Sequence, residues 1–130
     1  MPSRRKSRRT ATVRIDHSPL TVIDLDRVSA GQKTGQPSRV LNRVNESCAR
    51  LAAWQGDGPW HAHPTSDEMF VVLKGKLTLD IHGRGKLVVG PHQAVTIPAG
   101  TVHRPRASRR TVTLCFKQLV GDTVVYEEDH

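Results

Sequence analysis

The sequence predicts an all-β barrel. Residues that favour extended strands, above all Val, Ile and Thr, concentrate after residue 70. Short apolar runs alternate there with turns that contain Gly and Pro, and no long stretch repeats apolar residues at helical spacing. About seven or more short strands with regular turns are typical of an all-β barrel. A chain of 130 residues is long enough for one such domain.

The elements follow in order along the chain. A first short strand is expected at 20–25 and a loop at 29–38. The pattern from Val40 to Trp54 fits either a helix or strands, but its position just before the histidine stretch favours strands, two of them with a turn near Asn45. Gly75 is expected to form a hairpin turn, since Gly readily adopts a positive φ. The other expected strands open at Trp60 or lie at 68–73, 77–82, 87–89, 94–97 and 111–116.

The most informative stretch runs from His61 to Glu68. Residues i and i+2 of a strand point to the same face, so His61 and His63 are expected to project into one cavity. The polar residues 64–67 predict a turn that brings Glu68 beside them. Two imidazole nitrogens and one carboxylate oxygen suit Fe(II), Mn(II), Ni(II) or Zn(II).

A second segment strengthens this interpretation. It is the tight turn Pro98-Ala99-Gly100, followed by a strand that begins near His103. The spacing of both segments resembles the two motifs of the cupin superfamily, G-x5-H-x-H-x3,4-E-x6-G and G-x5-P-x-G-x2-H-x3-N. The positions in register are His61, His63, Glu68, Gly75, Pro98, Gly100 and His103.

The resemblance covers about residues 44–120 and is closest to the small bacterial single-domain cupins, often labelled mannose-6-phosphate isomerase-like. It implies a double-stranded β-helix, or jelly roll. It also implies a metal held by His61, His63, Glu68 and His103. Three secondary positions depart from the motifs: the first glycine falls at Gly56, one residue late, the second is His92, and the final Asn is Ala107.

The implied centre indicates the kind of ligand. One carboxylate against a dication leaves the site with a positive charge, which favours an anionic or hydroxy-carbonyl ligand. Four protein ligands leave two positions of a six-coordinate metal open. Strand parity predicts an apolar cavity wall, formed by Phe70, Val72, Leu77 and Leu79.

Two functions suit such a site. One is a metal-dependent isomerase or dioxygenase that acts on a small oxygen-rich compound. The alternative is a non-catalytic, metal-dependent sensor or binding protein, because no general acid or base is evident besides the ligands. A metal-free sugar-binding cupin is disfavoured by the complete ligand set. Fold alone does not decide between these functions.

The net charge of +8 is concentrated at the N-terminus. Residues 1–14 carry six basic residues and no acid, which predicts a disordered basic tail at 1–17 before a barrel at 18–130. Nucleic acid is therefore expected to bind, if at all, only through the tail.

Two cysteines do not form a disulfide framework, and no apolar run suits a signal peptide or membrane span, so a cytoplasmic location is expected.

The alternation of side chains along a strand also predicts which of them point away from the cavity. Met69, Val71 and Leu73 lie on the outer face yet are apolar, so a second protomer of a homodimer, or the segment at 20–25, is expected to cover them. Arg104 and Arg106 are expected to point away from His103. In the last strand, the residues expected to face inward are Val112, Leu114 and Phe116, after a solvated turn at 109–110.

Overall fold

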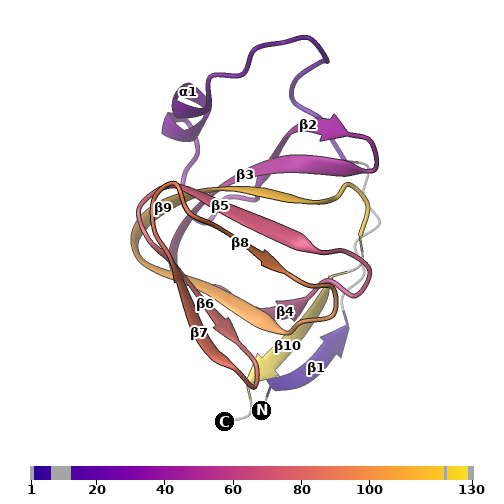
Figure 1. The fold of residues 1–130 in the computed structure, drawn as a ribbon, viewed down its shortest axis with the longest axis vertical. Helices are drawn as coiled ribbons and strands as arrows, with labels where there is room; N and C mark the ends of the chain where they lie inside the picture. Colours follow the sequence, from indigo (N-terminus) through magenta and orange to yellow (C-terminus); the bar gives the residue numbers. More distant parts are fainter. Residues whose placement is uncertain (1, 7–12, 122, 129–130) are drawn as a thin grey trace.

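The structure, a computed structural model, describes residues 2–6, 13–121 and 123–128. Within these ranges the chain forms one short helix and ten strands (Figure 1). Their bounds are β1 Pro2–Lys6, α1 Leu25–Ala30, β2 Arg39–Val44, β3 Ser47–Asp57, β4 Trp60–Ala62, β5 Glu68–Lys74, β6 Leu77–Ile81, β7 Gly85–Val89, β8 Ala94–Ile97, β9 His103–Gln118 and β10 Val124–Glu128. The predicted all-β double-stranded β-helix is confirmed.

The long strand β9 organises the barrel. Its first part pairs with β4 and β6, and its second part pairs with β5 on one side and β3 on the other, always antiparallel. The expected pair of strands before the histidine motif is also confirmed, because β2 and β3 pair antiparallel around Asn45, whose φ is 51°. This one strand therefore joins β3, β4, β5 and β6.

The barrel interior holds an apolar core beside the histidine cluster. Residues of β5 and β6 alternate between buried and half-buried, as expected for strands with one face inside. The buried members of this core are Phe70, Val72, Leu77, Leu79, Ile81, Val89, Ile97 and Cys115.

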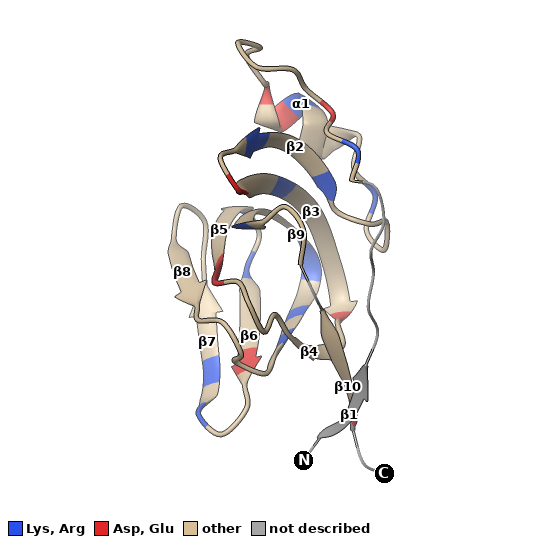
Figure 2. Ribbon diagram, turned by 90° about the vertical axis from the view of Figure 1, so that its right-hand side faces the viewer, with Lys and Arg blue, Asp and Glu red and all other residues tan. Residues whose placement is uncertain are grey.

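A second, smaller core lies outside the barrel and corrects two expectations. The segment expected to be a strand at 20–25 is irregular and leads into α1, whose first turn is capped by the Asp24 side chain accepting from the Arg27 N–H. Figure 2 shows α1 beside β2 and β3. The buried residues of this outer core are Leu41, Leu51 and Val112, with Ile23, Leu25, Val28, Leu73 and Leu114 packed against them.

Strand β9 is therefore oriented opposite to the expectation for residues 111–116, because Val112 and Leu114 were expected to face inward. Val112 and Leu114 face the outer core, whereas Thr113 and Cys115 face the interior. The prediction failed because α1 covers this outer face, so its residues are as apolar as those of a true interior. The segment 20–25 does help to cover Leu73, as one of the two expected alternatives proposed.

Three arginines of β9 form hydrogen bonds on the outside of the barrel. Arg104 and Arg106 both donate to the carboxylate of Asp80, which confirms that they point away from the cavity. The Arg106 and Arg104 hydrogen bonds outweigh partial desolvation and lower the pKa of Asp80. This stabilisation is present above the ordinary carboxyl pKa and is lost as the pH falls. Arg110 lies within β9 rather than in a turn, and it donates to the Ser29 and Gln32 carbonyl oxygens.

The basic tail expected at 1–17 is described in part. Pro2–Lys6 form β1, paired antiparallel with β10, instead of the disorder that the sequence predicts. The edge of β10 supplies the free backbone groups for this pairing. Asp16 donates its N–H to the Val40 carbonyl at 2.9 Å and accepts from Arg39 at 2.8 Å. Residues 1 and 7–12 lie outside the described residues, as do 129 and 130 of the acidic end.

Three general properties concern the whole described chain. None of the helices in the described ranges has the length and apolar character needed to cross a membrane. Cys48 and Cys115 are both buried free thiols. Lys and Arg residues are spread over several strands in Figure 2 rather than gathered on one.

Gly75 connects β5 and β6 by a turn that is not a hairpin. These strands do not pair with each other, since each pairs with a different part of β9. The glycine has a φ of 86°, as expected, and a Cβ at this position would lie 2.8 Å from the Arg110 carbonyl oxygen and closer still to the Thr111 hydroxyl. The turn thus presses directly on the β9 backbone.

We predict that Gly75→Ala destabilises the barrel by roughly 2–4 kcal/mol, because strain at positive φ adds to overlap with β9. Gly83→Ala is the matched control. Its φ is 78°, but a Cβ there meets no atom within 4 Å, so only about 1 kcal/mol should be lost. Urea denaturation followed by circular dichroism measures both; equal losses would contradict the close approach of this turn to β9.

Candidate metal centre

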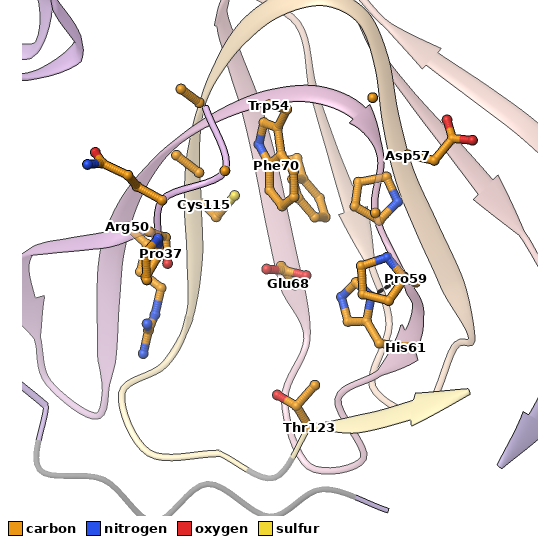
Figure 3. A pocket seen from close by; sticks show the side chains of 18 of the residues that line it. Pro37, Arg50, Trp54, Asp57, Pro59, His61, Glu68, Phe70, Cys115 and Thr123 are labelled. Carbon is orange, nitrogen blue, oxygen red and sulfur yellow. Dashed lines mark hydrogen bonds between the residues drawn. The ribbon is translucent and has the colours of Figure 1, made fainter. Parts of the chain in front are cut away.

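Three strands carry four side chains to one point of the interior. His61 lies on β4 opposite His103 of β9, and the two form a register pair. His63 follows β4 immediately, on the same face as His61, and Glu68 opens β5. The structure thus brings together all four residues that the sequence predicts, from segments up to 42 residues apart. Figure 3 shows Glu68 and His61 facing the cavity.

The four side chains are close enough to bind one ion. One potential ligand atom from each residue lies within 4.8 Å of all the others. Glu68 Oε1 is 3.2 Å from His63 Nε2 and 3.5 Å from His103 Nε2. The rings of His61 and His103 have centroids 4.3 Å apart. A metal ion coordinated by all four would therefore require little movement.

Hydrogen bonds behind the rings fix which nitrogen faces the centre. His61 Nδ1 lies 3.0 Å from the Pro59 carbonyl oxygen, and His103 Nδ1 lies 2.9 Å from that of Thr101. A carbonyl can only accept, so Nδ1 of each ring carries the proton. His63 Nδ1 has a longer contact, 3.4 Å, with the Thr123 hydroxyl. The Nε2 lone pairs of His61 and His103 are then free for a metal, as is usual for ligating histidines.

The centre holds buried polar atoms without hydrogen-bond partners. Among the described residues these include His63 Nε2, His103 Nε2 and Glu68 Oε1, all nearly inaccessible to solvent. Leaving such atoms unpaired costs about 1–3 kcal/mol each. A divalent cation would satisfy all three at once. The residues therefore fit the metal that the sequence motifs imply.

The protonation states also suit a metal. Burial, together with the neighbouring His103, lowers the pKa of His61 to about 4, so this imidazole is neutral at pH 7. Burial would raise the pKa of Glu68, but hydrogen bonds that His103 and His63 donate when they are protonated at Nε2, together with the charge of Lys117, outweigh it and hold that pKa well below its ordinary value. A neutral imidazole and an ionised carboxylate are the forms that bind metals.

A cavity of about 510 Å³ opens beside the cluster. His61, His63 and Glu68 line it, together with Phe70. Val72, Leu77 and Leu79, expected as cavity wall, are not among its lining residues. They belong to the fully buried core instead, because this part of the barrel is closed by side-chain packing. Phe70 forms the boundary between that core and the cavity.

Sequence reasoning missed the opposite wall of the cavity. That wall comes from β3 and the second half of β9, and includes Arg50, Ala52, Trp54, Cys115 and Lys117. Trp54 is held there by its indole N–H, which donates to the Thr113 hydroxyl at 2.7 Å. The spacing of two between these residues on each strand is a usable signal, but only once the pairing of β3 with β9 is known.

Comparison with known proteins agrees with this geometry. The family model of the cupin domain matches residues 49–116, which span both motifs. The chain belongs to the cupin domain family. This cupin is 43% identical to the uncharacterized protein YdbB of Bacillus subtilis (strain 168) over 88 residues, which is 68% of this chain and 78% of YdbB.

Solved structures show the same fold. A cupin-2 domain containing protein from Shewanella frigidimarina NCIMB 400 superposes with a TM-score of 0.71 at 23% identity, covering 75% of this chain and 94% of that one. The hydroquinone 1,2-dioxygenase PnpCD, solved with Cd²⁺ and 4-hydroxybenzonitrile, gives a TM-score of 0.64 at 19% identity, covering 85% of this chain and 82% of that one. At these identities the likeness concerns the fold alone.

We predict that His103→Ala and His63→Ala reduce the bound divalent metal from about one ion per chain to a small fraction, because each removes a buried ligand. Glu68→Gln should weaken metal binding but leave the barrel folded. His82→Ala is the matched control, since His82 is an exposed histidine outside the cluster. Elemental analysis of untagged protein measures the metal; full occupancy in the His103 variant would refute the ligand assignment.

Proposed function

We propose that this cupin is a metal-dependent enzyme, an isomerase or a dioxygenase, that acts on a small oxygen-rich compound inside the barrel. The ligands would be His61, His63, Glu68 and His103, with Zn, Ni, Fe or Mn as the metal. One observation carries the proposal: three buried atoms of the cluster that could bind a metal lack hydrogen-bond partners among the described residues, and the cluster adjoins a cavity of about 510 Å³. A centre needed only for stability would have no use for such a cavity.

A bound metal would supply Lewis acidity or oxygen activation at this point. The protein's own residues supply the rest. Glu68 contributes one negative charge, so the loaded centre stays positive and favours an anionic or hydroxy-carbonyl ligand. Phe70 and Trp54 present apolar surface to the cavity, which excludes water and strengthens electrostatic attraction between metal and ligand. The backbone carbonyls of Pro59 and Thr101 hold two of the imidazoles in place.

The alternative is a non-catalytic metal-dependent sensor or binding protein. The observation that favours it is the scarcity of proton-transfer groups in the cavity. Burial raises the pKa of the Cys115 thiol, which therefore stays protonated, and Asp57 is an exposed residue. An enzyme could still rely on the metal and on the substrate's own groups.

Loading and turnover experiments separate the two. We predict that protein loaded in turn with Fe(II), Mn(II), Ni(II) and Zn(II) converts at least one member of a panel of hydroxy acids, hydroxy ketones and hydroquinones, with oxygen uptake recorded alongside product analysis. Glu68→Gln should lose at least about tenfold in kcat/KM, because the metal is held less firmly. His82→Ala should behave as wild type.

Each other outcome has a definite meaning. Binding of panel compounds without conversion by any metal form would favour the sensor. Binding that is equal with and without metal would contradict direct coordination by the centre.

We also propose that the chain forms a homodimer through the outer face of β5. Met69, Val71 and Leu73 are all half-buried there, and of these only Leu73 is among the residues that pack against the outer core. Apolar surface of this kind is typical of subunit interfaces. A second protomer would cover what α1 leaves open.

Val71→Asp should convert the dimer to monomer, because a charge cannot be buried unpaired at the interface. Val88→Asp is the control, as Val88 is a 49% exposed valine on β7. Size-exclusion chromatography with light scattering measures the mass; a monomeric wild-type protein would rule out the interface.

Finally, we propose a cytoplasmic location. Cys48 and Cys115 are buried and are not joined to each other. Proteins with free thiols and no disulfide are typical of reducing compartments.

A further inference from the structure

The side chain of Arg50 forms part of the cavity wall. It lies on the inner face of β3, directly opposite Cys115 of β9, and lines the cavity that contains the metal ligands. Figure 3 shows Arg50 on one side of the cavity and His61 on the other, with Glu68 between them in this view. The side chain thus shares one space with the proposed metal centre.

The Arg50 guanidinium is only partly satisfied. Its Nη2 donates to the Leu119 carbonyl oxygen at 3.3 Å, but its Nε is buried and has no hydrogen-bond partner among the described residues. No carboxylate of the described chain forms an ion pair with it. The Arg50 side chain is half-buried, and its Nε is a buried donor left unsatisfied, which is unfavourable, so a purely structural role leaves this arrangement unexplained.

A second cation stands beside it. Lys117 is two residues beyond Cys115 on the same face of β9, which makes it a diagonal neighbour of Arg50 across the β3–β9 pair. Both residues line the main cavity and also a second hollow of about 340 Å³, where His63 and Thr123 are again present. The two cations therefore lie where the two hollows meet, close to the metal ligands.

Part of the wall of the cavity that holds the cations and the centre is apolar. Ala52, Trp54, Phe70 and Cys115 supply this surface. The carboxylates that line the cavity are Glu68, already committed to the centre, and the exposed Asp57. A cavity with a dication at one point and two cations at another needs an anion with two polar ends.

We propose that Arg50 and Lys117 form a carboxylate-binding subsite, and that the natural ligand is a small carboxylic acid with a second oxygen function. Its carboxylate would bind Arg50 and Lys117, its short apolar body would lie against Phe70 and Trp54, and its second oxygen group would face the centre. Arginine presents a planar fork of N–H donors that matches a carboxylate. The inference deepens the proposed function, and its last element rests on that function.

The test uses pairs of ligands that differ by one charge. Metal-loaded protein is titrated calorimetrically with malonate, succinate, glutarate and adipate, and with the half-amide of each. The half-amide has the same length but only one carboxylate. For the best-fitting length we expect the diacid to bind at least about tenfold more tightly than its half-amide, since hydrogen bonds between charged groups contribute about 1.5–3 kcal/mol.

Variants then assign this preference to the subsite. Arg50→Met should weaken diacid binding by about 10- to 100-fold and bring the diacid and half-amide close to equal affinity. Arg50→Lys should restore part of the preference, and Lys117→Met should remove part of it. The matched control is Lys86→Met, an exposed lysine on β7. Elemental analysis should show unchanged metal in all four variants, because none of these residues is a ligand.

The outcomes distinguish this inference from the proposed function. Wild-type protein that does not prefer any diacid, or an Arg50→Met variant that keeps the preference, overturns the subsite but leaves the metal centre untouched. Full metal occupancy in the His103→Ala variant overturns the metal centre. The dependence of diacid affinity on Arg50 is measured separately, in metal-stripped protein. If inorganic phosphate displaces the best diacid at equal concentration, the carboxylate assignment is wrong. Should Arg50→Met fail to fold, Lys117→Met and Arg50→Lys decide.

Discussion

The convergence of three imidazoles and one carboxylate inside the barrel is the constraint on which the rest of the structure depends. His63 Nε2, His103 Nε2 and Glu68 Oε1 are buried together without hydrogen-bond partners in the part of the chain that the structure describes, an arrangement that is unfavourable unless a cation joins them. The fold holds it through β9, whose register with β4 sets His103 opposite His61. The tight turn at Gly75, pressed on the same strand, fixes where β5 ends and β6 begins.

The local pattern of the sequence predicted most of the His/Glu cluster because its members depend on short-range geometry. Two histidines at spacing two share a face in any strand, and the turn before Glu68 needs only polar residues. The cupin resemblance added His103. The alternation of apolar and polar residues along a strand was a less reliable guide to the inner face where both faces are covered. Val112 and Leu114, for example, pack under α1 and not in the interior.

The elements that the sequence did not reveal are set by long-range pairing. The expected strand at 20–25 is irregular and leads into α1, because the Asp24 cap and the packing of Leu25 and Val28 against the outer core outweigh weak strand propensity. Arg50 and Lys117 belong to one wall only because β3 pairs with β9. Neither residue is distinguished within its own segment, so no local pattern could select it.

The most direct test of the account is anomalous X-ray diffraction from crystals of the untagged protein, recorded above and below the absorption edge of the metal found by elemental analysis. The account predicts one strong anomalous peak bonded to Nε2 of His61, His63 and His103 and to the carboxylate of Glu68. Absence of a peak at this point, with the four side chains hydrogen-bonded to one another or to water, would contradict it.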